Sequence, residues 1–155
     1  MQKLDWCLKL KNGLKIVNLN ERIAKVYLNE AKLSLERAQK NFKDNDLLWT
    51  TIVIYYAEYY ALYSFLQRIG IKSENHFCSI LGVSKLLGED KVKRIKIHKE
   101  KRIDAQYFLK FDKKDEISEM LSEAKLFVSY FDELVSNIKG EEIESYRYKL
   151  ETKNI

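Results

Sequence analysis

The sequence predicts an all-α fold, an up-and-down bundle of four or five helices preceded by a short N-terminal β-hairpin. Its 155 residues are 46% hydrophobic, which is enough for one packed domain. It contains no proline and only five glycines, so it has few of the residues that make turns. Apolar residues also recur at steps of three and four over long segments, which is typical of helices that bury one face.

The N-terminal segment alternates apolar and cationic residues on both sides of Asn12-Gly13. This dipeptide favours a type I′ turn, so we predict a β-hairpin over about residues 6–18. An isolated hairpin is marginally stable in water, and we expect Trp6 and Cys7 to anchor it to the rest of the domain.

Five helical segments follow, which we expect at about residues 20–42, 46–68, 73–87, 89–107 and 117–138. The second is apolar nearly all round, so it should be central and covered on more than one side. The last has the clearest seam, with apolar residues at alternating steps of four and three: Ile117, Leu121, Ala124, Val128, Phe131, Val135 and Ile138. We therefore predict one domain over residues 1–140, followed by a charged tail over residues 141–155.

The second helical segment carries five tyrosines at close spacing. Tyrosine is common at interfaces because its ring buries area while its hydroxyl still finds a partner. Core packing inside the bundle is the alternative interpretation. The residues that we expect at a dimer interface are Tyr55, Tyr56, Tyr59, Tyr60 and Tyr63.

Several classes of protein are disfavoured. No GxGxxG or GxxxxGK spacing occurs, which excludes glycine-rich phosphate loops. Cys7 and Cys78 belong to no CxxC or Cys/His cluster, so we expect neither a zinc site nor a disulfide, and we predict no metal and no cofactor. Glu58 and many hydroxyl groups interrupt the apolar stretch 47–66, which argues against a membrane span. The N-terminus lacks the apolar run of a signal peptide, which predicts a cytoplasmic protein.

The net charge of +5 is concentrated in one segment. Between Lys91 and Arg102 there are seven cations and one anion, Glu100. A basic helix face attracts polyanions such as RNA, DNA, a nucleotide or an acidic protein, and the alternative is a solvated helix face. The side chains that we expect to bind RNA or a nucleotide are Lys91, Lys93, Arg94, Lys96, Lys99, Lys101 and Arg102.

Few residues suggest catalysis. His98 lies four residues before Arg102, so both point to one helix face, where imidazole would move a proton while guanidinium holds an anionic oxygen. The alternative is that His98 is a surface side chain. Glu58 is a carboxylate on an apolar helix, which is costly unless it is paired. We expect a structural ion pair for Glu58, for example with Arg102, while a tyrosine hydroxyl or solvent would also satisfy it.

Several short motifs, in their order and spacing, resemble the HEPN family of small helical domains, in particular its archaeal stand-alone members. The similarity covers about residues 5–138. The motifs are Asp5-Trp6-Cys7, Tyr27-Leu28-Asn29-Glu30-Ala31 with Ser34-Leu35, Ile54-Tyr55-Tyr56-Ala57-Glu58-Tyr59-Tyr60-Ala61, Gly70-Ile71-Lys72-Ser73-Glu74-Asn75-His76 and Lys101-Arg102-Ile103-Asp104-Ala105-Gln106-Tyr107.

The resemblance implies a helical bundle that forms homodimers. Many family members are metal-independent endoribonucleases with an R-x4–6-H motif that meets its copy across the dimer cleft. Others bind RNA, nucleotides or a partner nucleotidyltransferase. The motif arginine falls on Arg102, and the histidine position holds Tyr107, whose phenol is a poor base at neutral pH.

We therefore predict a homodimer that binds RNA, a nucleotide or a partner nucleotidyltransferase through the basic helix, with a degenerate ribonuclease motif. In this interpretation Arg102 holds phosphate and Tyr107 orients or stacks on the ligand. The alternative is a metal-independent endoribonuclease, the toxin of a toxin–antitoxin pair. It would use Arg102 with His98 or Tyr107, and with polar help from Glu58.

Overall fold

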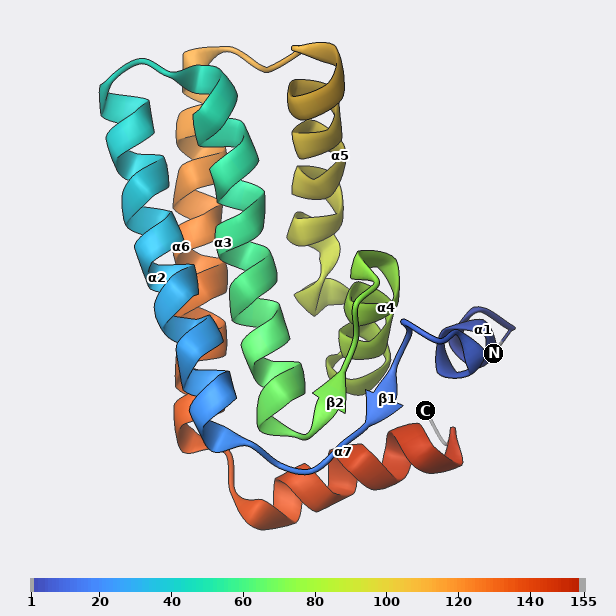
Figure 1. Cartoon of the computed structure of the whole chain (residues 1–155). Helices are drawn as coiled ribbons and strands as arrows, with labels where there is room; N and C mark the ends of the chain where they lie inside the picture. Colours follow the sequence, from blue (N-terminus) through green and yellow to red (C-terminus); the bar gives the residue numbers. More distant parts are fainter. Residues whose placement is uncertain (1, 154–155) are drawn as a thin grey trace.

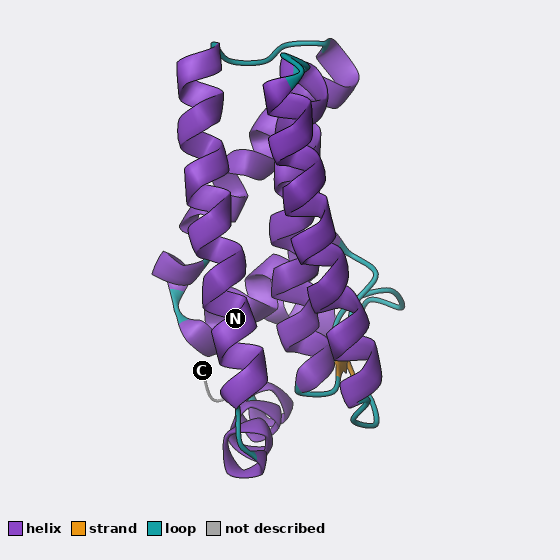
Figure 2. Cartoon of the chain, turned by 90° about the vertical axis from the view of Figure 1, so that its left-hand side faces the viewer, coloured by secondary structure: helices purple, strands orange, loops and turns teal. Residues whose placement is uncertain are grey.

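The structure is a helical bundle, and the computed structural model describes residues 2–153 of the chain. Four long helices, α2, α3, α5 and α6, stand side by side, while α7 crosses one end of the bundle and α1 lies beside α4 (Figures 1 and 2). The elements in chain order are α1 (Gln2–Lys9), β1 (Lys15–Ile16), α2 (Glu21–Lys43), α3 (Leu47–Arg68), β2 (Ile71–Lys72), α4 (His76–Leu87), the short 3-10 helix η1 (Glu89–Lys91), α5 (Lys93–Phe108), α6 (Lys114–Asn137) and α7 (Gly140–Thr152).

Helix α3 is the centre of the bundle, as its apolar sequence predicts. It contacts α2, α4, α5 and α6, and most of its side chains are buried. The Asp46 side chain caps its start by accepting a hydrogen bond from the backbone of Trp49 at 3.1 Å. Gly70 follows its end with a φ of 74°, a left-handed conformation that favours glycine. The prediction of a central helix is confirmed.

Helix α6 covers α3 with the predicted seam. All seven seam residues, from Ile117 to Ile138, are buried. The side chains of this seam divide between two hydrophobic clusters, one of which also includes buried residues of α1, α4 and α7. The all-α bundle expected from the sequence is therefore confirmed.

The predicted N-terminal hairpin is wrong. Most of its first arm belongs to helix α1, and Asn12-Gly13 lies in the turn that leaves this helix. Strand β1 pairs antiparallel with β2, with Lys15 opposite Lys72 and Ile16 opposite Ile71. The partner strand thus comes from the segment after α3, and no local pattern around Asn12-Gly13 indicates it.

The predicted tail forms a packed helix. Ile143 and Leu150 of α7 are buried, and the Tyr146 ring packs edge to face against the Phe65 ring, with 5.4 Å between the ring centres. Nη1 of Arg147 donates hydrogen bonds to the carbonyls of Val17, Ile69 and Gly70 at 2.9, 3.0 and 3.1 Å. Helix α7 therefore closes one end of the bundle. Met1 and residues 154–155, the outer ends of the predicted domain and tail, lie outside the described residues.

The expectation that the cysteines remain unpaired is wrong. Cys7 of α1 and Cys78 of α4 form a disulfide across a sequence separation of 71 residues. Both are fully buried, because α1 packs against the start of α4. The bond fixes α1 to the domain, which also explains why an eight-residue helix is held there.

The apolar stretch of α3 raised the question of a membrane span. Among the described helices, none is both long enough and apolar enough to cross a bilayer.

Candidate functional site

Arg102 is the centre of a cluster where α3, α4 and α5 meet. Its side chain points from α5 towards α3, and the residue is only 9% exposed. The guanidinium carbon lies 4.8 Å from the ring centre of Tyr55 and 5.7 Å from that of Tyr56. These distances are typical of cation–π contacts, which hold a cation without neutralising its charge.

The hydrogen-bonding capacity of Arg102 is largely unused. Nη1 donates to Oε1 of Gln106 at 3.3 Å, and the buried Nε has no partner within residues 2–153. No carboxylate of this described part of the chain lies within 4 Å of the guanidinium. Burying an unpaired charge is costly, so an anion that reached this arginine would gain both a charge partner and free donors.

His76 lies next to Tyr55, at the first position of α4. Its Nδ1 lies 2.8 Å from the Tyr55 hydroxyl, and its ring stacks on Tyr59 with 3.8 Å between the ring centres. Burial, and then the charges of Arg102 and Lys99, lower the pKa of His76 to about 4. Imidazole is therefore neutral at pH 7 and is a weak base there.

The Tyr55 hydroxyl fixes the orientation of this imidazole. Burial raises the pKa of Tyr55, so its hydroxyl stays protonated and shares a hydrogen bond with Nδ1 of His76.

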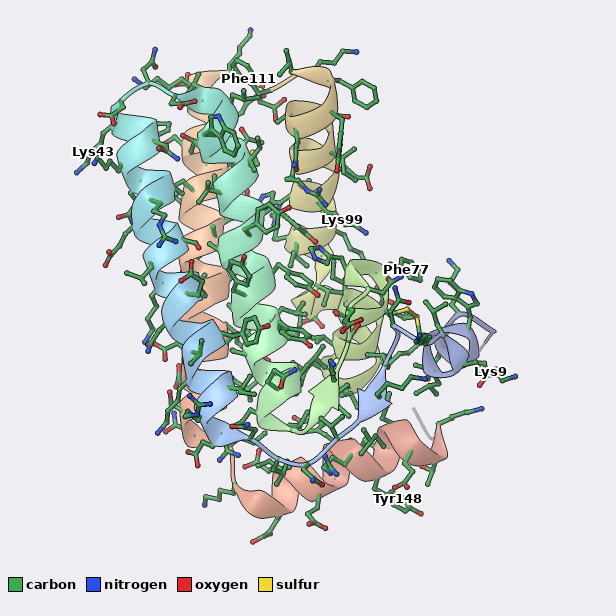
Figure 3. The ribbon with its side chains drawn as sticks, in the orientation of Figure 1. Lys9, Lys43, Phe77, Lys99, Phe111 and Tyr148 are labelled. Carbon is green, nitrogen blue, oxygen red and sulfur yellow. A yellow bond between two sulfur atoms is a disulfide. The ribbon has the colours of Figure 1, made fainter. Side chains whose placement is uncertain are left out.

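Lys99 extends the cluster along α5, one turn before Arg102. Burial lowers its pKa, with Glu100 acting in the opposite sense and Arg102 adding to the decrease. The ammonium nitrogen lies 6.0 Å from the ring centre of Phe77, the residue after His76. Figure 3 shows Lys99 and Phe77 on the side of the molecule where α4 meets α5. We call Arg102, Lys99, His76, Tyr55 and Tyr56 the Arg102 site.

Most of the other predicted RNA-binding cations already have carboxylate partners. The ion pairs, with their nitrogen–oxygen distances, are Lys91–Asp90 at 3.8 Å, Arg94–Glu123 at 2.6 Å, Lys96–Glu89 at 2.9 Å and Lys101–Asp112 at 2.9 Å. Of the seven cations, Lys93, Lys99 and Arg102 lack a carboxylate within 4 Å in the described residues. The basic segment is thus not one free cationic face, and its available charge near α4 comes from Lys99 and Arg102.

His98 and Glu58 form a buried pair away from solvent. Nδ1 of His98 lies 2.7 Å from Oε1 of Glu58, and the two residues are 1% and 0% exposed. On the other side of the ring, Nε2 lies 3.8 Å from Oε1 of Glu123. The partner of Glu58 is therefore His98 and not Arg102, and neither group is open to a ligand.

Tyr107 does not join the Arg102 site. It lies five residues after Arg102 on α5, so it points to a different side of the helix, and it is 66% exposed. The arrangement that the R-x4-Y motif suggested, with Arg102 and Tyr107 acting together, is not present within this chain. His98 does share a helix face with Arg102, but Glu58 occupies its Nδ1.

The five tyrosines divide between two environments. Tyr55, Tyr59 and Tyr63 are buried under α4 and the segment before it, so their rings are not available to a second subunit. Tyr56 and Tyr60 are partly exposed. The core-packing alternative therefore holds for three of them, and the interface stays a prediction for Tyr56 and Tyr60.

His76 is a residue of this site that the sequence alone does not indicate. Asn75 indicates a helix start, since its side chain accepts a hydrogen bond from the Cys78 backbone at 3.0 Å. That signal places His76 in a first helical turn, but its position beside Arg102 depends on how α4 packs.

As for metals, no group of three His, Cys, Asp or Glu side chains in the described chain is arranged to hold an ion.

Comparison with known proteins agrees with this architecture. A family model described as HEPN domain matches residues 24–134, which run from the first turns of α2 to the last turns of α6. The comparison with curated proteins gives no match. HEPN domains commonly dimerise and have functions related to nucleotides or RNA. Because the family model matches well over half of the 155 residues, the chain belongs to the HEPN domain family.

Proposed function

We propose that this HEPN domain binds the phosphate groups of RNA or of a nucleotide through the Arg102 site and acts as a homodimer. The observation that carries the proposal is the guanidinium of Arg102, which is nearly buried and lacks a carboxylate partner in the described chain. Lys99 adds positive charge at the same site. A nucleotide held by a partner nucleotidyltransferase presents the same phosphate chemistry, so such a partner would use the same residues.

The same geometry favours binding over RNA cleavage. Attack by a 2′-hydroxyl needs a group that accepts its proton, and losing such a group typically costs about 10²–10⁴ in rate. His98 is buried against Glu58, Tyr107 points elsewhere, and His76 has a low pKa with Nδ1 already occupied. We therefore propose that the domain holds its ligand without cleaving it.

The Arg102→Ala variant is expected to bind single-stranded RNA about 10- to 100-fold more weakly, because a charge-assisted hydrogen bond contributes about 1.5–3 kcal/mol. Binding of a fluorescein-labelled RNA oligonucleotide, measured by anisotropy at about 50 mM salt, tests this. Lys43→Ala is the matched control, since it removes one exposed cation on the far side of the bundle (Figure 3). Circular dichroism of both variants verifies that they are folded.

Two results would contradict this proposal. Equal weakening of RNA binding in Arg102→Ala and Lys43→Ala would mean that only overall charge matters, and absence of wild-type binding at low salt would rule out phosphate recognition altogether.

Cleavage is tested with the same RNA, which is incubated with the protein in EDTA, recovered and run on a gel. Cleavage by the wild type that disappears in Arg102→Ala would support the endoribonuclease alternative instead.

The homodimer is tested separately. We expect the protein to sediment as a dimer at micromolar concentration, and we expect Tyr60→Glu to shift it towards monomer, because a charge would enter the predicted interface beside Tyr56. Tyr148→Glu is the matched control, since this exposed tyrosine lies on α7 and outside the predicted interface on α3 (Figure 3). A wild-type monomer, or an intact Tyr60→Glu dimer, would rule out this interface.

A further inference from the structure

A groove of about 840 Å³ lies between α4 and α5, next to the Arg102 site. Its floor is apolar and consists of Phe77, Ile80 and Leu81 from α4. Lys99 lines the groove and is also part of the Arg102 site, so the two are continuous along α5. A ligand bound to Lys99 would therefore lie both in this groove and at the Arg102 site.

One aromatic ring, that of Phe77, lines the groove, and the ring of Trp6 contacts it. Trp6 of α1 meets Phe77 of α4 edge to face, with 6.2 Å between their centres. Trp6 is 50% exposed and Phe77 is 40% exposed, so both keep free ring surface. The disulfide joins Cys7 and Cys78, the residues that directly follow the two rings, and so holds them beside each other. Exposed, fixed aromatic rings beside cations are a surface on which nucleobases stack.

The charge of the groove is positive after its ion pairs are counted. Glu89 is already bound, since it accepts hydrogen bonds from Lys96 at 2.9 Å and from Ser84 at 2.7 Å. The other cations that line the groove have no carboxylate within 4 Å in the part of the chain described: Lys3, Lys85 and Lys99. Glu100 is the single opposing charge, so the groove carries a surplus suited to phosphate.

We propose that this groove binds a nucleotide unit, with its base stacked on Phe77 and Trp6 and its phosphate near Lys3, Lys85 and Lys99. This proposal rests on the proposed function, because it continues phosphate binding from Arg102. Only an unpaired base offers a free face to these rings, so single-stranded RNA fits and duplex RNA does not. Trp6 and Lys3 lie outside residues 24–134, so α1 adds this subsite to the region matched by the family model.

Tryptophan fluorescence gives a direct test, because the chain has only two tryptophans. Trp49 is at the start of α3, away from the groove, so Trp49→Phe leaves Trp6 as the reporter. We expect single-stranded RNA to quench Trp6 in this variant, and duplex RNA of the same sequence to leave it unchanged. The reverse variant, Trp6→Phe, reports on Trp49 and is expected to show no quenching. Free AMP and ATP are titrated in parallel to distinguish a mononucleotide from a strand.

Affinity provides the second measurement. Phe77→Leu keeps an apolar floor but removes the ring, and we expect it to weaken binding of single-stranded RNA about 5- to 50-fold. Phe108→Leu is the matched control, since this exposed phenylalanine lies at the end of α5 and does not line the groove, and its affinity is expected to stay that of the wild type.

The outcomes separate the two proposals. If Arg102→Ala weakens RNA binding while Phe77→Leu and the Trp6 signal do not respond, the groove proposal is overturned and the Arg102 site stands. If the wild type binds neither RNA nor the mononucleotides, both fall. Quenching of Trp6 by AMP or ATP without RNA binding would support the groove and assign it to a free nucleotide.

Discussion

Glu58→Ala is expected to lower the free energy of unfolding by about 3–5 kcal/mol, the usual cost of breaking a buried charge pair by removing one partner. The substitution leaves the imidazole of His98 buried without the carboxylate 2.7 Å away, and it also removes volume from the centre of α3. Urea unfolding of the variant and the wild type, followed by circular dichroism at pH 6, measures the difference. A loss below 1 kcal/mol would mean that the pair contributes little.

The pH dependence of stability identifies the interaction itself. Burial disfavours the charged form of His98, but the hydrogen bond to Glu58 and the negative charge of Glu58 have the larger effect, so the pKa of His98 is raised. Burial also raises the pKa of Glu58. The folded pair therefore keeps its proton above about pH 6.5, where an unfolded histidine releases it. Its contribution is fully present below about pH 6.5 and is lost as the pH rises through the higher folded-state pKa.

We expect the wild type to lose stability above about pH 6.5, with a slope of at most about 1.4 kcal/mol per pH unit from this pair. Glu58→Gln is the matched control, because it keeps the shape of the side chain and removes the charge that raises the pKa of His98. Its stability should be less dependent on pH in this range. Parallel curves for the two proteins would exclude the pair as the source.

Reduction of the disulfide between Cys7 and Cys78 is expected to lower the free energy of unfolding by about 4 kcal/mol. The bond closes a loop across a sequence separation of 71 residues, and loops of this length restrict the unfolded chain strongly in the chain-entropy account. Thermal unfolding with and without dithiothreitol measures the effect, and a thiol assay in denaturant counts the cysteines that are free. Equal melting temperatures with two thiols released would contradict the expected stabilisation.

The Cys7→Ser/Cys78→Ser double variant provides the control for reduction. It should unfold at the same temperature with and without dithiothreitol, close to the reduced wild type. A further decrease on adding the reagent would show that it acts on something other than this bond.

The bundle could be predicted because its signals are local. The spacing of apolar residues along the sequence predicts both the seam of α6 and the apolar residues on nearly all sides of α3, and both helices pack as expected. The hairpin could not be predicted correctly, because the partner of β1 lies after α3 and an alternating segment resembles a strand even where it forms α1. The disulfide depends on α1 folding back onto α4, which no spacing between the two cysteines encodes.

The site was predicted less completely for the same reason. Arg102 follows from its place in the motif, but its neighbours come from three helices. The sequence predicts that Glu58 needs a partner, yet His98 and Arg102 lie on one face of α5, and only packing decides which of them meets the carboxylate. His76 comes 26 residues before Arg102, and their proximity requires both α4 and α5 to be in place.

Three tyrosines one turn apart on α3 each hold part of α4 or the segment before it. The hydroxyl of Tyr55 bonds to His76 at 2.8 Å, that of Tyr59 to Ser79 at 2.9 Å, and that of Tyr63 accepts from the backbone of Ser73 at 3.1 Å. These bonds fix the start of α4 relative to α3 before any ligand arrives. If the Arg102 site binds phosphate as we propose, association avoids much of the entropy loss that ordering a mobile loop would impose, and this rigidity increases affinity.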